Sequence, residues 1–304
     1  MSGDHDKAWD EFWASNKGAG KGSGCLPEGW RGIDQVQRDV WRGFARKLKG
    51  GDRVLDLASG DGRVMAYLLS GRRALKITGI DQASRLPSPP RGTKLKGGVS
   101  MDALPMPDAS FAAITSQFGL EYGDLAKTAA EMWRVARPGA LVGIMSHRED
   151  GPIVAHNLRR REQILWATEE QDLPAMALHS LQLRAAGIAT IPQTIAEAPE
   201  KGARAFGRGS AAWEIAEAIR QTLHYGRNDR ADAVANLIRE IAAQARNELG
   251  RIASLADAAK NAALGERIAA ALGGAGFELQ SREQLRDGAE QAPFADFSVF
   301  RKPD

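Results

Sequence analysis

Cysteine is almost absent from this 304-residue chain, which contains only Cys25. A single cysteine cannot form an internal disulfide, and it cannot provide a metal site built from several thiolates. Apolar runs are also short, and none approaches the ~18 residues that a membrane-spanning helix requires. The opening residues, MSGDHDKAWDEFW, are acidic and lack the apolar stretch of a secretion signal. These absences predict a cytoplasmic protein without a membrane partner.

Several motifs that would indicate other enzyme classes are missing. The chain has no H-E-x-x-H sequence for zinc and no G-x-S-x-G sequence of a serine hydrolase. A phosphate-binding loop would require a glycine at position 15 and a Ser or Thr after Lys21, but Ser15 and Gly22 stand there. We therefore expect no metal site, and we interpret residues 16–29 as a flexible linker or flap.

Neither sign of charge dominates, because 41 lysines and arginines face 38 aspartates and glutamates, a net charge of +3. An imbalance this small does not indicate a surface for nucleic acid or for an anionic membrane. Apolar residues make up 43% and charged residues 26% of the chain, as in ordinary globular proteins. A chain of this length can form one large domain or two moderate ones.

Strand and helix patterns alternate along two stretches of the chain, residues 52–148 and 265–304. Alternation of this kind forms right-handed crossovers, which give a parallel sheet with helices on both faces. We expect Pro138 and Gly139 to end the helix that precedes the fifth strand. Apolar runs typical of strands occur at residues 53–58, 75–81, 93–97, 111–118, 140–147, 277–280 and 294–302.

Helical patterns without strands fill residues 149–264. This block interrupts the α/β region as a large α-helical insertion after its fifth strand. Residues 1–51 precede the α/β region, and they combine an aromatic-rich start with the linker and a helical pattern at residues 34–48. Within residues 231–260, one helix face carries Leu237, Ile238, Ile241, Ala245, Leu249, Ile252, Leu255 and Ala259.

The stretch VLDLASGDGRV, residues 54–64, joins an apolar strand to a helix through a short loop. In open parallel sheets, ligands bind beyond the carboxyl ends of the strands, where such a loop lies. Gly60 and Gly62 let the backbone approach a ligand closely, and the loop amides with the helix N-terminus favour a negatively charged group. A nicotinamide or flavin nucleotide requires G-x-G-x-x-G, but Met65 replaces the third glycine. The loop therefore does not match a dinucleotide site.

Acids stand at two strand ends around this loop, Asp56 before Gly60 and Asp81 at the end of the next strand. The order of acid, Gly-x-Gly loop, strand and second acid resembles class I S-adenosylmethionine-dependent methyltransferases. Their first motif usually runs D-x-G-x-G-x-G, and here residues 56–62 read D-L-A-S-G-D-G. Ala58 replaces the first glycine, and its methyl group fits there if the backbone φ of Ala58 is negative.

Further segments match this family in the right order. Residues 100–122 resemble the stretch from the adenine-contacting acid into the fourth strand, and residues 134–147 resemble the fourth helix and fifth strand. The resemblance covers residues 52–147 and 265–304. It implies a doubly wound, seven-stranded, mostly parallel sheet of the Rossmann-like α/β class. It also implies S-adenosyl-L-methionine as cofactor and S-adenosyl-L-homocysteine as its product.

The resemblance assigns roles to individual residues. Asp81 aligns with the acid that hydrogen-bonds the ribose hydroxyls, and Asp102 and Ala103 align with the adenine contacts. In the alternative interpretation, Asp56 only caps a loop amide, and Asp81 and Asp102 are turn residues. The cofactor-binding residues implied in this way are Asp56, Ala58, Ser59, Gly60, Gly62, Asp81, Gln82, Asp102, Ala103, Gln117 and Phe118.

A base for the incoming acceptor must lie at the carboxyl ends of the fourth and fifth strands. Those ends carry Gln117, Phe118, Glu121, Tyr122 and His147. We predict His147 and Tyr122 as catalytic residues, with His147 removing a proton from an acceptor hydroxyl. The alternative is that His147 hydrogen-bonds the chain that enters the helical insertion.

The fourth strand ends in SQFGLEY, without the Asn/Asp-Pro-Pro-aromatic element of many methyltransferases that act on nucleobase or glutamine amino groups. With the small net charge, this absence favours a small-molecule acceptor over nucleic acid, and it leaves open whether O, N or C is methylated. A second hypothesis is a non-catalytic protein that keeps the fold to bind a cofactor or partner. The insertion at 149–264, with the N-terminal aromatic segment, either caps the acceptor site or forms a homodimer interface.

Overall fold

The computed structural model describes Trp9, Phe12, Trp13 and residues 30–185, 187, 191–288 and 291–304. The chain divides into two compact units. Unit 1 comprises residues 1–155 and 254–304, and unit 2 comprises residues 156–253, which lie inside the predicted helical insertion. Helices α5 (Pro152–Leu165) and α9 (Ala231–Ala262) each contribute residues to both units.

Unit 1 is built on a seven-stranded sheet with the order β3-β2-β1-β4-β5-β7-β6. Strand β7 runs antiparallel to β5 and β6, whereas the other neighbouring strands run parallel. The order reverses between β1 and β4, so these strands flank the switch point of the sheet. This doubly wound, mostly parallel sheet confirms the predicted fold class. The strands are β1 (Arg53–Leu57), β2 (Lys76–Ile80), β3 (Lys94–Lys96), β4 (Phe111–Gln117), β5 (Ala136–His147), β6 (Glu278–Leu285) and β7 (Ala295–Arg301).

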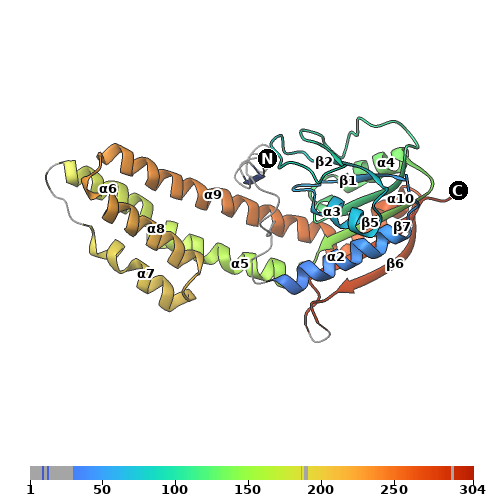
Figure 1. Ribbon diagram of the computed structural model, residues 1–304. Coiled ribbons are helices and arrows are strands. Elements are labelled where there is room, and N and C mark those ends of the chain that lie inside the picture. Colours follow the sequence, from blue (N-terminus) through green and yellow to red (C-terminus); the bar gives the residue numbers. More distant parts are fainter. Residues whose placement is uncertain (1–8, 10–11, 14–29, 186, 188–190, 289–290) are drawn as a thin grey trace. The chain divides into compact units, whose positions relative to one another are not determined.

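Helices cover both faces of this sheet (Figure 1). Successive side chains of a strand point to opposite faces, so a strand buried on both sides is apolar throughout. On β1, Val54 packs into the core shared with α2 and α3, whereas Leu55 and Leu57 pack into the core shared with α4 and α10. The four helices are α2 (Arg31–Arg46), α3 (Arg63–Gly71), α4 (Leu125–Val135) and α10 (Glu266–Gly274).

Unit 2 is helical and has its own apolar core, to which Ile195, Ile219 and Ile238 contribute fully buried side chains. The spacing of apolar residues predicts most of the buried face of α9 correctly. Leu237 is an exception, because it is 51% exposed beside the fully buried Ile238. Besides the two shared helices, the unit contains α6 (Leu173–Ala185), α7 (Gln193–Phe206) and α8 (Ala211–Tyr225).

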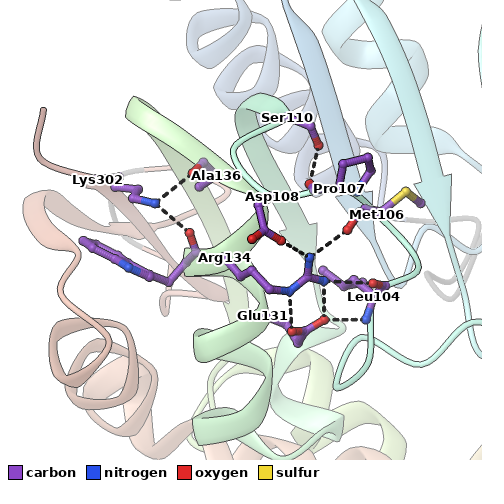
Figure 2. A network of polar contacts seen from close by, with 10 residues as sticks. Leu104, Met106, Pro107, Asp108, Ser110, Glu131, Arg134, Ala136 and Lys302 are labelled. Carbon is purple, nitrogen blue, oxygen red and sulfur yellow. Dashed lines mark hydrogen bonds and ion pairs between the residues drawn. The ribbon is translucent and has the colours of Figure 1, made fainter.

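Pro138 and Gly139 do not end the helix before the fifth strand, contrary to the sequence-based expectation. Helix α4 ends at Val135, and β5 begins at Ala136, so both residues lie inside the strand. Lys302 explains the early end of the helix, since its Nζ donates to the carbonyls of Trp133 and Ala136 at 2.8 and 2.9 Å (Figure 2). A distant lysine thus satisfies carbonyls that a turn would otherwise have to satisfy.

Arg134 connects α4 to the loop that leads into β4 (Figure 2). Its guanidinium donates to both carboxylate oxygens of Glu131 at 2.8 and 2.7 Å, and to Asp108 at 2.7 Å. It also donates to the carbonyls of Leu104 and Met106. Planar, charge-assisted bonds of this kind are stronger than neutral ones and set the geometry of both partners. The position of the loop after residue 102 therefore depends on one arginine.

Replacement of Arg134 by methionine should lower the free energy of unfolding by about 2–3 kcal/mol, because bonds to several acceptors are lost together. Urea denaturation monitored by circular dichroism measures this change. Arg137→Met is the matched control, since Arg137 is 48% exposed and pairs with Asp52. Its loss should cost less than about 1 kcal/mol. Equal effects of the two substitutions would show that the Arg134 network does not stabilise the fold.

Candidate functional site

The loop after β1 lies at the carboxyl edge of the sheet, beside the switch point. Ala58, Gly60 and Gly62 adopt left-handed conformations, with φ of 52°, 51° and 76°. The amide of Ser59 donates to the carbonyl of Ile80, which joins the loop to the end of β2. The turn into α3 therefore requires positive φ at three positions, and glycine fits two of them without strain.

The φ of Ala58 is positive, contrary to the expectation of a negative φ at this position. A left-handed alanine costs of order 1 kcal/mol relative to glycine. Its methyl group is accommodated because Gly119, in the loop after β4, has no side chain. A Cβ at Gly119 would lie 2.3 Å from the Cβ of Ala58. The glycine that the family motif places at position 58 is thus replaced by an alanine that faces a glycine.

Asp81 lies at the end of β2 and bridges two loops with its carboxylate. Its Oδ2 accepts from the amide of Gly60, and its Oδ1 accepts from the amide of Ala83, both at 2.9 Å. Asp81 is half-buried at the edge of the sheet. The predicted ribose-binding acid therefore also holds the glycine loop in place. Gln82, predicted beside it, is exposed.

Asp56 lies below the loop rather than on its surface, with 1% of the residue exposed. Its Oδ1 accepts from the hydroxyl of Thr115 on β4 at 2.7 Å. Its Oδ2 is buried and has no hydrogen-bond partner among the described residues. Burial is the main cause that raises the pKa of this carboxyl to about 7; the hydrogen bonds from Thr115 and Ser59 lower that pKa, and the nearby charges of Asp81 and Asp61 add to the increase. Asp56 therefore joins the two strands that flank the switch point.

The predicted adenine-contacting segment lies at the amino end of the loop that Arg134 holds. The Oδ1 of Asp102 accepts from the hydroxyl of Thr128 on α4 at 2.6 Å. The amide of Asp102 donates to the hydroxyl of Ser100, and the neighbouring Ala103 is exposed. Both residues lie at the carboxyl edge, and their contact with adenine stays a prediction.

The side chain of Gln117, at the end of β4, is hydrogen-bonded to α2. Its Oε1 accepts from the indole of Trp41 at 2.6 Å, and its Nε2 donates to Gln37 at 3.2 Å. Trp41 and Gln37 are fully buried. The next residue, Phe118, has a φ of 54° and stacks on His147, with ring centroids 4.2 Å apart. Gln117 therefore attaches α2 to the sheet, while Phe118 lies against the predicted base.

His147 ends β5 and is buried against Glu121, which follows β4 in the short helix η1 (Leu120–Tyr122). One oxygen of Glu121, Oε1, lies 2.9 Å from both the backbone amide and the Nδ1 of His147. The side chains of His147 and Glu121 are 7% and 0% exposed. The sequence analysis places Glu121 among the residues at the strand ends where a base must lie, but it predicts no pairing with His147, since only the fold brings the ends of β4 and β5 together. An acid directly after a strand end was the available signal.

Aromatic side chains form a row from the glycine loop to His147. A Cβ at Gly60 would lie 2.5 Å from the indole of Trp13, so this ring is the group that approaches the loop. Trp13 stacks with Trp9 at 6.4 Å between centroids, and Trp9 contacts Tyr122 edge-on at 5.8 Å. Tyr122 in turn contacts His147 edge-on at 6.3 Å. The N-terminal aromatic residues therefore contact the site inside unit 1.

Within the described residues, no group of three or more His, Cys, Asp or Glu side chains is arranged to hold a metal ion. In that same part of the chain, no helix is long and apolar enough to cross a membrane.

The buried carboxyl of Asp56 gives a pH-dependent stability. Its pKa is higher in the folded protein, about 7, than the ordinary value of 3.8, so folding is favoured by protonation. The free energy of unfolding should fall as pH rises between these values, by up to about 1.4 kcal/mol per pH unit. Asp56→Asn should remove this slope.

Urea denaturation at pH 5, 6 and 7 measures how the free energy of unfolding of the parent and of Asp56→Asn changes with pH. Asp257→Asn is the matched control for loss of one carboxyl group, because Asp257 is exposed on α9. If parent and Asp56→Asn lose stability equally over this range, the carboxyl of Asp56 does not titrate as its burial requires.

Known proteins match the same part of the chain. A family described as a methyltransferase domain matches residues 55–144. A 2-phytyl-1,4-naphtoquinone methyltransferase of Synechocystis sp. is 29% identical over 141 residues, which cover 41% of this chain and 58% of that protein. A demethylmenaquinone methyltransferase of Thermus thermophilus is 32% identical over 117 residues, which cover 34% of this chain and 53% of that protein. The chain therefore spans little more than half the length of these relatives.

Among solved structures, the YcgJ protein of Bacillus subtilis matches with a TM-score of 0.34 and 18% identity, over 43% of this chain and 58% of that chain. The family match begins within β1 and ends within β5, so it includes the glycine loop, Asp81 and the ends of β2 and β4. Sheet order and motif agree with this match, and unit 1 has the doubly wound fold and the glycine-loop motif that resemble class I S-adenosylmethionine-dependent methyltransferases.

Proposed function

We propose that this protein transfers a methyl group from S-adenosylmethionine to a small-molecule acceptor. The observation that carries the proposal is the glycine loop at the switch point, held by Asp81 within a matched methyltransferase domain. Ligands of open α/β sheets bind at this edge, beyond the carboxyl ends of the strands. The buried base candidate His147 ends a strand at the same edge.

The residues of this edge fit the proposed cofactor. Gly60 and Gly62 have positive φ, and the loop opens directly into α3, whose N-terminus favours a carboxylate. The carboxylate of Asp81 is the acceptor for ribose hydroxyls, and Asp102 stands at the predicted adenine end. A bound S-adenosylmethionine supplies a methyl group already activated by its sulfonium, so the protein mainly orients the acceptor, excludes water and removes a proton.

The chemistry of the acceptor is suggested by the walls of the site. Phe118 and Tyr122 each contact the ring of His147, and Trp9 and Trp13 extend this row to the glycine loop. Flat aromatic side chains favour a flat aromatic ligand through offset and edge contacts. The named substrates of the two relatives are quinones. We therefore propose a planar aromatic acceptor with an ionisable hydroxyl, such as a reduced quinone.

The N-terminal aromatic residues cover part of the site in this proposal. Trp13 lies against Gly60, so it is placed to shield a ligand on the glycine loop from water. The role of the insertion at 149–264 stays a prediction, with a cap and a homodimer interface as the two alternatives.

Transfer of labelled methyl groups from S-adenosylmethionine tests the proposed activity. We expect label in a 2-alkyl-1,4-naphthohydroquinone or in a simple phenol, and none in mixed transfer RNA, because the acceptor site is lined by flat apolar rings. Extraction into organic solvent separates these products from the labelled cofactor. Label in the RNA, or none in any acceptor while the cofactor binds, would contradict a small-molecule methyltransferase. The second of these results would favour a cofactor-binding protein without catalysis.

Asp81→Ala should weaken binding of S-adenosylhomocysteine at least tenfold in isothermal titration calorimetry. A hydrogen bond to a charged group contributes about 1.5–3 kcal/mol, and about 1.4 kcal/mol corresponds to a factor of ten. Asp39→Ala is the matched control, because Asp39 is exposed on α2. Thermal denaturation verifies that both variants fold. An unchanged affinity of Asp81→Ala would remove this residue from the cofactor site.

A further inference from the structure

We propose that Glu121 is a positioning residue that holds His147 as the tautomer protonated on Nδ1 and so presents Nε2 as the base. The role of that base rests on the proposed methyl transfer, whereas the tautomer itself does not. Neutral imidazole carries its proton on one nitrogen only, and the partner of the other nitrogen decides which.

The hydrogen bonds of Glu121 determine the tautomer. A backbone N–H is always a donor, so Oε1 of Glu121 must be an acceptor where it meets the amide of His147 at 2.9 Å. The same oxygen lies 2.9 Å from Nδ1 of the ring. With Glu121 ionised, its carboxylate oxygens are acceptors only, so Nδ1 is the donor in this second bond. Nε2 is then the nitrogen with the free electron pair.

The imidazole ring is also held in one orientation. Phe118 stacks on it with an interplanar angle of 23°, and Tyr122 meets it edge-on. Phe118 reaches this place through a left-handed backbone, which costs an L-residue of order 1 kcal/mol. Strain of this kind persists where the surrounding structure holds it, and it often marks functional sites.

Glu121 is itself held from the other side. Its backbone carbonyl accepts from the side chain of Asn261 at 2.7 Å, which ties η1 to the end of α9 within unit 1. Its second oxygen, Oε2, is buried without a hydrogen-bond partner among the described residues. A buried carboxylate with one oxygen unpaired costs stability, so its retention calls for a role beyond packing. A role as partner of a transient imidazolium accounts for it.

Other charged groups near the pair are already engaged. Arg148, the next residue, donates from Nη1 to both oxygens of Asp296 on β7 at 2.9 and 3.1 Å. Its Nε and Nη2 donate to Asp150 at 2.9 Å each. This guanidinium is therefore balanced by two carboxylates, and Glu121 is bonded to His147.

In the proposed reaction, the acceptor hydroxyl loses one proton, and His147 takes it up. The proton of an acceptor hydroxyl moves to Nε2 of His147, and the acceptor electrons form the new bond to the methyl carbon. The carbon–sulfur bond breaks with its electrons remaining on sulfur. His147 becomes an imidazolium whose charge is stabilised by Glu121, because an opposite charge at hydrogen-bond distance favours the charged form. Release of the proton to solvent restores the base.

Nitrogen-15 spectroscopy of protein with labelled histidine side chains tests the tautomer without any acceptor. We expect the His147 signals of the parent to show a protonated Nδ1 and an unprotonated Nε2 at pH 8, and His147→Gln assigns them by their loss. In Glu121→Gln, the side-chain oxygen can still accept from Nδ1, whereas in Glu121→Leu Nδ1 has no acceptor from residue 121, so the preference for one tautomer should weaken in Glu121→Leu. Glu283→Gln, an exposed position on β6, should leave the spectrum unchanged.

Kinetics complete the test with S-adenosylmethionine and the naphthohydroquinone as probes. Glu121→Leu should lower kcat about 100-fold, as expected for loss of an oriented base, with little change in the calorimetric affinity for S-adenosylhomocysteine. A parent spectrum with the proton on Nε2, or equal kcat in parent and Glu121→Leu, would overturn the positioning role. If Glu121→Leu does not fold, the parent spectrum still decides the tautomer. A parent without methyl transfer but with Nδ1 protonated would refute the proposed function alone.

Discussion

The hydrogen bond between Thr115 and Asp56 joins β1 to β4 where the strand order of the sheet reverses. On the β1 side of this strand pair, β2 brings Asp81 to the glycine loop. On the β4 side, β4 and β5 bring Glu121 to His147. Parallel strands end at the same edge, so the pairing of β1 with β4 sets the distance between the glycine loop with Asp81 and the pair of Glu121 and His147. A buried carboxyl is costly unless it is protonated or paired. One oxygen of Asp56 is hydrogen-bonded, and burial raises the pKa of this carboxyl.

The segments beside β4 and β5 are held by contacts from distant parts of the chain. Arg134 fixes the loop before β4, Lys302 closes the end of α4, and Gln117 attaches α2. Arg134 and Lys302 act where β4 and β5 begin, at the edge of the sheet opposite the site. Gln117 acts at the end of β4, so it is the contact of these three that supports the edge with the site.

Much of the fold was predictable from sequence, because a parallel sheet buried on both faces leaves a strong pattern of apolar runs between helices. The glycine loop and Asp81 were predictable because a turn with positive φ and an acid at a strand end are local features. The pairing of Glu121 with His147 was not, since it joins two strand ends that are adjacent only in the folded sheet. The early end of α4 depends on Lys302, which is far away in sequence, and Leu237 faces outward although its spacing suggests burial.

The contact between Ala58 and Gly119 has a consequence for how this chain can diverge. The methyl group of one residue occupies the place that a side chain of the other would need. A substitution that enlarges position 119 is therefore tolerated only after position 58 has become glycine, and the reverse change at 58 is permitted at any time. The two sites should co-vary among homologous sequences with a fixed order of events. A search pattern that demands glycine at the first motif position would overlook chains that, like this one, carry alanine there.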